Sequence, residues 1–504
     1  MKSMSGYFPK KTITFERASI GILLILGLVL RLRQYLSVRS LWADEAMLAL
    51  NIVNRSFGEL FQPLDFNQGA PIGFLLVEKF FHTILGRHEL VLRFFPFLAG
   101  LAALGLFYLL LKQITYRAGM LVALALFAVN PQLVYYTSES KQYIVDVMVW
   151  LAILVLALPL FQRPPRRQDF LILAVAGMLA LWLSHPALFA LAGIGIALCI
   201  HFLQKRTMAD LGWIIIIGIF WLANFALLYF INVRNLSNNS YLNHYWANEF
   251  FPIPPDLSWF MTYVSENIPL QFGIPYLPGL VVILIFAGWF WLYVESRPVA
   301  WTFALITVFA FAASALQLYP VKGRLALFLI PLGIILLGKS VELVQKRFVD
   351  KKVTATMVTL ALGAYLLYGP LSTSIPLFIT PKYFEHMRPY LDYLSASWKA
   401  DDELFVSFWA EPAFQYYAPF YHLEDVQYIS SIEEDYLTPQ ILQTRFAPLL
   451  GKKRVWVLFS HVYEQGSFNE RDFVIAYLDE IGTKTREFRV PNASVYLFLF
   501  DLSQ

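Results

Sequence analysis

Two adjacent carboxylates, Asp44 and Glu45, follow Trp42 and precede an apolar run, shortly after the first hydrophobic segment of the chain. A carboxylate at the boundary between water and membrane can act as a general base, taking a proton from a hydroxyl or amine as that group attacks. The pattern also favours a structural role, because Asp is a common helix N-cap and Glu45 suits the positive end of a helix. The two roles are compatible, since a capping position would hold the Asp44 carboxylate rigidly.

Further charged residues stand directly before two later hydrophobic segments. The stretch SESKQY contains Glu139, Lys141 and Tyr143, and YPVKGR contains Lys322 and Arg324. Charges at a membrane boundary are costly and are therefore candidates for function. The alternative interpretations are an ion pair between Glu139 and Lys141, an interfacial aromatic belt, and snorkelling cations. Because Lys322 and Arg324 are predicted to face outward, where anchoring cations are rarer, we favour a phosphate or pyrophosphate clamp.

The histidines give weaker signals. His244 lies with Trp246 and Glu249 in a loop rich in proline and aromatic residues, which suits stacking on sugar rings and equally suits packing against the membrane domain. His185 stands between two predicted spans and is expected to be structural. The sequence has no zinc-like spacing, Walker motif or Gly-x-Ser-x-Gly elbow, which argues against nucleotide-driven transport and serine hydrolase chemistry. We expect no cofactor and no metal site, and a divalent metal is not expected.

Composition predicts that membrane-spanning helices carry these residues. The chain has 504 residues, of which 58% are hydrophobic and 15% charged, whereas a soluble domain has about 25% charged residues. The net charge of +4 does not indicate a nucleic-acid partner, and the single cysteine, Cys199, rules out a disulfide framework. A span needs about 20 apolar residues. Eleven segments qualify, centred near residues 27, 101, 126, 152, 177, 195, 221, 286, 308, 332 and 361.

The distribution of positive charge predicts the orientation of these spans. Basic links such as QRPPRRQ join alternate spans and are expected in the cytoplasm, which places the N-terminus inside. We do not count residues 70–86 as a span, because each of the charges at Glu78 and Lys79 would cost about 2.5–3.5 kcal/mol there. This segment is expected to be an amphipathic helix on the outer surface. The outer loop that contains it also carries Arg93 and other cations, which suit a lipid phosphate.

The predicted architecture therefore has two domains. A helical membrane domain covers residues 1–370 and has outer loops at 37–93 and 232–276, and a small α/β domain outside the membrane covers 371–504. In the second domain, β-like runs such as RVWVLFS and SVYLFLF alternate with helix-like runs such as ERDFVIAYLDEI.

In this arrangement the sequence resembles the polyprenyl-phosphate-sugar dependent membrane glycosyltransferases of the GT-C fold, a group that includes protein O-mannosyltransferases and the lipid A aminoarabinose transferase. The matching pieces are LWADEA, APIGF with ELVLRFFPFLAGLAALGLFYLL, YYTSESKQYIVDV and YPVKGRLALFLIPL. They follow the order of the family and cover the membrane region, whereas the C-terminal region matches only a loosely defined outer domain.

The resemblance implies that Asp44 is the catalytic base, with Glu45 as its usual neighbour, and that Lys141 and Arg324 bind the carrier phosphate. Arg93 matches a family arginine at the head of the second span. Many relatives have arginine where this chain has Lys141, and lysine offers a point charge instead of a bidentate fork. The implied reaction is an inverting transfer of a sugar from polyprenyl phosphate to a hydroxyl or amine on a lipid, protein or glycan acceptor.

The same resemblance places the protein in a bacterial cytoplasmic membrane, surrounded by membrane lipids, with the active site on the outer side. The alternative is a transporter or flippase for a lipid-linked solute. That alternative is disfavoured because internal repeats are missing and the polar residues gather at one predicted face instead of the bilayer midplane.

Overall fold

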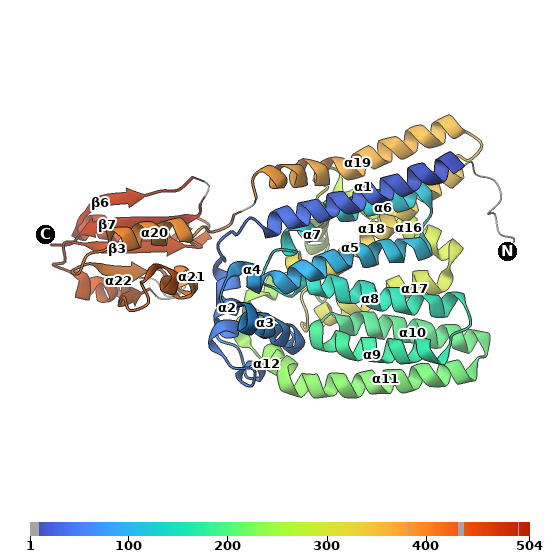
Figure 1. The fold of residues 1–504 in the computed structure, drawn as a ribbon, viewed down its shortest axis with the longest axis horizontal. Helices are drawn as coiled ribbons and strands as arrows, with labels where there is room; N and C mark the ends of the chain where they lie inside the picture. Colours follow the sequence, from blue (N-terminus) through green and yellow to red (C-terminus); the bar gives the residue numbers. More distant parts are fainter. Residues whose placement is uncertain (1–9, 382, 432–437, 492, 504) are drawn as a thin grey trace. The chain divides into compact units, whose positions relative to one another are not determined.

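The computed structural model describes residues 10–381, 383–431, 438–491 and 493–503, and these form two compact units (Figure 1). The first unit comprises Met1–Ser37, Phe57–Gly86 and Arg93–Pro381. The second comprises Val38–Ser56, Arg87–Leu92 and Lys382–Gln504. Each unit is described separately below.

The first unit consists mainly of long apolar helices, and every predicted span centre lies in one of them. Among the described residues, nine helices are long and apolar enough to cross a membrane. Two predicted spans are shorter, because α6 has 13 residues and α9 has 17. The long helices and these two are α1 (Lys10–Tyr35), α5 (Phe94–Ile114), α6 (Arg117–Val129), α8 (Tyr143–Gln162), α9 (Arg167–Leu183), α10 (Ala187–Lys205), α11 (Met208–Leu228), α16 (Pro278–Glu295), α17 (Arg297–Ala315), α18 (Ile330–Arg347) and α19 (Lys352–Ile379).

Short helices connect the ends of these spans, and two of them, α13 and η5, carry the candidate residues His244 and Arg324. The predicted outer loop 232–276 is largely built of such helices. Those used below are α3 (Ile72–Leu85), α7 (Pro131–Tyr136), α13 (Ser240–Tyr245), η3 (Ala247–Glu249), α14 (Leu257–Thr262), η4 (Tyr263–Asn267), α15 (Ile268–Phe272) and η5 (Gly323–Leu329).

A buried ion cluster joins α6, α16 and α18. The Lys339 ammonium lies 2.6 Å from a Glu295 carboxylate oxygen and 2.7 Å from one of Glu342. The other Glu342 oxygen accepts a hydrogen bond from the Tyr116 backbone N–H, directly before α6. Removing one member would leave a buried charge without its partner, which is strongly destabilising. The cluster therefore fixes the C-terminal end of α16 and the start of α6 against the middle of α18.

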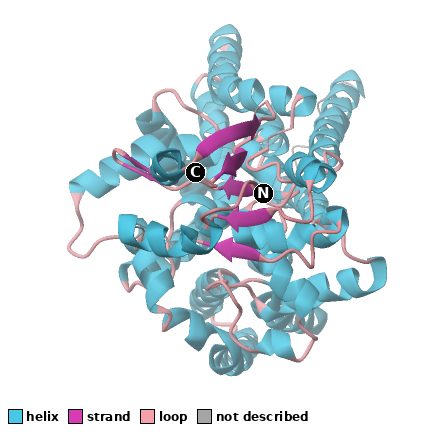
Figure 2. Ribbon diagram, turned by 90° about the vertical axis from the view of Figure 1, so that its left-hand side faces the viewer, coloured by secondary structure: helices cyan, strands magenta, loops and turns pink. Residues whose placement is uncertain are grey.

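The second unit contains a mixed five-stranded sheet in the order β2-β1-β3-β7-β6 (Figure 2). Strand β1 (Glu403–Val406) is parallel to β2 (Tyr428–Ser430) and β3 (Val455–Ser460), whereas β7 (Val495–Asp501) is antiparallel to β3 and β6 (Thr483–Phe488). Helices α22 (Pro439–Phe446) and α23 (Glu470–Ile481) cover one face. On the other face, Tyr393 of α20 (Arg388–Ser397) stacks on Phe488 at 4.1 Å. The predicted α/β character of this region is confirmed.

Two pieces of the predicted first outer loop belong to this second unit. They contain α2 (Ala43–Asn54) and α4 (Glu89–Leu92). Helix α2, which carries the two candidate catalytic acids, packs against α21 (Glu411–Tyr417). The predicted domain boundary at residue 371 falls inside α19, which continues to Ile379. The second unit, called the C-terminal unit below, thus contains two short segments from the N-terminal part of the chain in addition to its continuous C-terminal segment.

Candidate active site

Asp44 lies in the first turn of α2 but does not cap it. The helix begins at Ala43, its N-cap residue is Trp42, and no side chain of the cap residue bonds to the helix. The Ala43 N–H instead donates a 2.9 Å hydrogen bond to a carboxylate oxygen of Glu385. The N-cap interpretation of Asp44 is therefore wrong, because an acceptor 342 residues away in the sequence takes that role. Asp44 is half-buried and Glu45 is fully buried.

The Glu385 carboxylate connects the start of α2 to the end of β3. The oxygen that accepts from Ala43 also accepts from the Ser460 hydroxyl at 3.1 Å. Its second oxygen lies 2.7 Å from Nδ1 of His461. The His461 ring is in turn close to the rings of Trp42 and Trp409, with centroid distances of 5.9 and 5.5 Å. Sequence reasoning missed Glu385 and His461, because no local spacing links them to Asp44.

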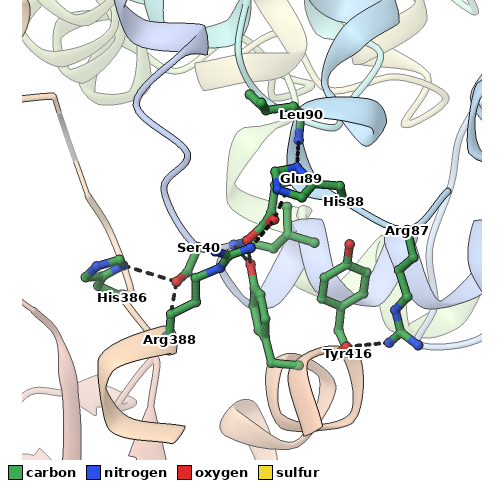
Figure 3. A network of polar contacts seen from close by, with 10 residues as sticks. Ser40, Arg87, His88, Glu89, Leu90, His386, Arg388 and Tyr416 are labelled. Carbon is green, nitrogen blue, oxygen red and sulfur yellow. Dashed lines mark hydrogen bonds and ion pairs between the residues drawn. The ribbon is translucent and has the colours of Figure 1, made fainter. Parts of the chain in front are cut away.

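A second buried network holds the segments around α2 and α4 within the C-terminal unit (Figure 3). Glu89 accepts hydrogen bonds from the Arg388 guanidinium at 2.5 Å and from the Tyr417 hydroxyl at 2.8 Å. The Ser40 hydroxyl lies 3.1 Å from Nδ1 of His386. Burial lowers the pKa of His386, so its ring is neutral at physiological pH. These contacts hold Ser40, which stands four residues before Asp44, and α4 within the C-terminal unit.

Lys141 is buried next to a loop of the first unit. Its ammonium donates a 2.6 Å hydrogen bond to the side-chain oxygen of Gln68. The side chain of the following residue, Gln142, donates to the Gly69 carbonyl at 3.2 Å. Glu139 is buried in the same segment, which leads directly into α8. The polar stretch before α8 is thus positioned by residues that lie about 70 positions earlier in the chain.

Arg324 is positioned beside the same end of α8. Its guanidinium carbon lies 5.5 Å from the centroid of the Tyr143 ring and 5.7 Å from that of Trp246, within the range of cation–π attraction. The preceding residue, Gly323, has a φ of +56° and donates its N–H to the Asn267 side chain at 2.9 Å. The Gln271 side chain donates to the Gly323 carbonyl. Arg324 therefore lies against the ring of Tyr143, and Lys141 stands two residues before Tyr143 in the chain.

The other predicted phosphate ligands have different surroundings. Lys322 lies 3.4 Å from a Glu249 carboxylate and 3.7 Å from one of Glu266, so its charge is already matched. Arg93 is buried at the N-terminal end of α5, where it and Glu78 both lie near Tyr35. His244, the candidate for contact with a sugar, is exposed on α13.

Helix α3 covers most of residues 70–86, the segment predicted to be an amphipathic helix on the outer surface. Its carboxylate, Glu78, is fully buried, and burial raises the pKa of Glu78 well above its usual range. The large exposed side chains of α3 are instead apolar, namely Phe80, Ile84 and Leu85. At 14 residues, α3 is also too short to be one of the candidate spans. Its exposed apolar face suits contact with lipid.

His185 forms part of an apolar cavity of about 300 Å³ in the first unit. Its Nε2 lies 3.1 Å from the side-chain oxygen of Asn232, and burial lowers the pKa of His185 to about 4. The ring is therefore neutral at physiological pH, in line with a structural role. Leu181, Phe225 and Tyr319 line the same cavity. Across the described ranges, no group of three or more His, Cys, Asp or Glu side chains is placed to hold a metal ion.

Comparison with known proteins identifies relatives of this arrangement. Residues 69–230 match the family model described as dolichyl-phosphate-mannose-protein mannosyltransferase. No curated protein sequence matches the chain.

Solved structures match over nearly the whole chain. ArnT from Cupriavidus metallidurans in the apo state has 12% sequence identity and a TM-score of 0.54, and the match covers 97% of this chain and 98% of that one. The same protein bound to undecaprenyl phosphate gives 12% identity, 98% coverage of both chains and a TM-score of 0.52. The archaeal oligosaccharyltransferase AglB from Archaeoglobus fulgidus, in complex with an inhibitory peptide and a dolichol-phosphate, gives 11% identity, 98% and 75% coverage and a TM-score of 0.54. The chain shares the GT-C fold with these proteins.

Proposed function

We infer that this chain, a membrane glycosyltransferase by its family match and its GT-C fold, transfers a sugar from a polyprenyl phosphate to an acceptor hydroxyl or amine with inversion at the anomeric carbon. One observation carries the proposal. The guanidinium carbon of Arg324 lies 5.5 Å from the ring of Tyr143 at the N-terminal end of α8, and Lys141, 183 positions before Arg324, is buried in the segment that leads into the same helix end. Two cations held at the end of an apolar helix suit the phosphate of a lipid-linked donor.

The proposed role of these cations is to bind the donor and stabilise the departing phosphate. The bond between the anomeric carbon and the phosphate oxygen breaks, and its electron pair leaves with the polyprenyl phosphate. Lys141 and Arg324 match the charge that develops on that oxygen, which is the electrostatic contribution expected of such a site. Because Lys322 is paired with two carboxylates, we assign it no direct role at the phosphate.

The proposed base is Asp44. The acceptor oxygen or nitrogen forms the new bond to the anomeric carbon from the face opposite the phosphate, and its proton passes to the Asp44 carboxylate. The position of Asp44 in the first turn of α2 supports this role, because Glu385 fixes the adjacent Ala43 backbone. Glu45 is buried beside it and is assigned a supporting role.

Relatives with this fold bind lipid phosphates, since ArnT is seen with undecaprenyl phosphate and AglB with a dolichol-phosphate. In this chain, the apolar cavity beside His185 has a volume of about 300 Å³ and suits part of a polyprenyl chain. Transfer is proposed to occur at the outer side of a bacterial cytoplasmic membrane.

The proposal is tested by retention of undecaprenyl phosphate on the purified full chain, measured by native mass spectrometry in detergent. We expect Lys141→Ala and Arg324→Ala each to weaken retention by about tenfold, because a charge-assisted contact to phosphate contributes about 1.5–3 kcal/mol. Equal retention by wild type and both variants, or no retention at all, would remove the phosphate site.

Two matched variants control for loss of a cation beside a tyrosine. Arg297 lies 5.4 Å from the Tyr293 ring, and Lys112 lies 5.7 Å from the Tyr108 ring. Arg297→Ala removes an arginine and Lys112→Ala removes a lysine, the same residue types as in the two test variants. Both lie at helix ends that have no part in the proposed phosphate site. Both should retain undecaprenyl phosphate as wild type does.

A further inference from the structure

A pocket of about 580 Å³ lies in the first unit, between the short helices that follow α13 and the segment that precedes η5. Its walls come from residues 247–263, Ala315, Gln317 and Lys322. The volume falls within the range of small-molecule sites, which is about 300–1,000 Å³. The phosphate chemistry proposed above does not use this pocket.

One wall is aromatic and is fixed from behind. Trp259 stacks on Tyr263 with a centroid distance of 5.0 Å, and Phe251 meets Trp259 edge-on at 5.3 Å. The Tyr263 hydroxyl donates to the Val321 carbonyl at 3.1 Å, and the Phe251 N–H donates to the Ser314 hydroxyl at 2.8 Å. These contacts anchor the wall to the end of α17 and to the segment before η5, so the wall is preformed.

The rest of the lining combines polar side chains with the apolar residues Ala247, Phe250, Pro252, Ile253 and Ala315. Asn248, Ser258, Thr262 and Gln317 supply neutral donors and acceptors, and Asp256 supplies a carboxylate that also caps α14. Lys322 is the one cation among the described lining residues, and it is paired with Glu249 and Glu266. A lipid tail would not use these polar groups, and a nucleotide would need unmatched cations for its phosphates. An aromatic wall beside neutral hydrogen-bonding groups suits a sugar ring, which has apolar C–H faces and hydroxyl edges.

The pocket adjoins the proposed phosphate site through the chain itself. Lys322 lines the pocket and stands two residues before Arg324. Ala247 also lines it and directly follows Trp246, whose ring lies 5.7 Å from the Arg324 guanidinium carbon. A ligand in the pocket would therefore lie next to the group proposed to hold the donor phosphate.

We propose that this pocket binds a carbohydrate ring, either the sugar of the lipid-linked donor or a sugar of a glycan acceptor. This inference rests on the proposed function, because the site next to the pocket is identified as a phosphate site only by that proposal. Trp259 provides the stacking surface, and Asn248 and Thr262 hydrogen-bond to sugar hydroxyls.

The test uses the full chain in detergent with three variants. Trp259→Ala removes the stacking surface, and the double variant Asn248→Ala with Thr262→Val removes two exposed polar groups without touching the aromatic wall. The control is Trp301→Ala, because Trp301 is exposed on α17 and packs against Trp289 and Tyr293, away from the pocket. All four proteins are first compared for retention of undecaprenyl phosphate.

The two possible sources of the sugar are distinguished by two probes. In the donor arm, retention of mannosyl-phosphoryl-undecaprenol is compared with that of undecaprenyl phosphate by native mass spectrometry. In the acceptor arm, binding of the methyl α-glycosides of mannose, glucose and N-acetylglucosamine is followed by saturation-transfer NMR with undecaprenyl phosphate present. We expect both pocket variants to lose about tenfold in affinity in one arm, while Trp301→Ala matches wild type.

Loss confined to the donor arm identifies the donor sugar, and loss in the acceptor arm identifies a glycan acceptor. The inference is overturned if wild type binds none of the sugar probes more tightly than the pocket variants do. A failure of the proposed function looks different, because wild type would then not retain undecaprenyl phosphate at all.

Discussion

At the scale of single residues, the position of Asp44 separates it from an ordinary surface acid. Asp44 is the second residue of α2, where the positive end of the helix dipole stabilises a negative charge. Its backbone is held by the bond from Ala43 to Glu385, so Asp44 itself is not needed as the helix cap. A carboxylate in the first turn of a helix whose backbone is fixed in this way suits a base that must meet its acceptor in one geometry.

Asp44→Asn is expected to abolish sugar transfer while leaving undecaprenyl phosphate retention and thermal stability close to wild type. The amide keeps the size of the side chain but cannot accept the proton, and loss of a general base typically costs about 10²–10⁴-fold in rate. The measurement is release of undecaprenyl phosphate from a panel of undecaprenyl-phosphate sugars, and Asp65→Asn, an exposed acid of the same predicted loop, serves as control. A variant that keeps most of the wild-type rate would remove Asp44 from the mechanism.

At the scale of elements, Glu385 links two segments that carry the candidate chemistry. One carboxylate binds the first N–H of α2, the hydroxyl of Ser460 at the end of β3 and the His461 ring. The first residue of α2 is therefore fixed by Glu385, a residue from the C-terminal part of the same unit. The residue has no described place in a substrate pocket, and we assign it a positioning role.

Glu385→Ala should lower both the melting temperature and the turnover rate. It removes a helix cap worth about 1 kcal/mol and leaves buried donors without an acceptor, at about 1–3 kcal/mol. Glu385→Gln keeps an oxygen for Ala43 and should have a smaller effect on both. Because the change acts through Asp44, the rate should fall while the apparent KM for the donor stays unchanged.

The control for this pair is Glu424→Ala, since Glu424 is exposed on the same unit. Thermal melting and donor-dependent turnover are measured for all four proteins. If Glu385→Ala melted like wild type and turned over at the same rate, the positioning role would be wrong.

At the scale of the whole molecule, the functional proposal depends on which side of the membrane each unit faces. The basic links between alternate helices predict that residues 37–93 and the C-terminal unit lie outside. This orientation stays a prediction, and the two shorter helices α6 and α9 are the elements on which the parity of the spans depends.

Cysteine labelling in intact cells measures this orientation. In a Cys199→Ala background, Gln62→Cys and Glu424→Cys should react with a membrane-impermeant maleimide, whereas Gln204→Cys should react only after the membrane is permeabilised. All three positions are exposed in the structure, so burial does not account for protection. Protection of Gln62→Cys or Glu424→Cys in intact cells would place the proposed base, or its unit, on the wrong side.

Features that depend on local pattern can be predicted from the sequence alone. Apolar runs of span length, continuous apolar strands such as Val455–Ser460 and the placing of Lys141 and Arg324 at span ends can all be read from neighbouring residues. The family resemblance added the expected chemistry of Asp44, because it compares motifs in order along the chain.

Features that join distant parts of the chain become visible only in the folded structure. Glu385, and not Asp44, accepts the hydrogen bond from the first N–H of α2. Two carboxylates form ion pairs with Lys322, and Glu78 lies on the buried face of α3. The sugar-sized pocket likewise combines residues 247–263 with Gln317 and Lys322. Hydrogen bonds, ion pairs and burial depend on proximity in space, and the partner of a side chain can lie hundreds of positions away in the sequence. Local periodicity therefore does not predict these contacts.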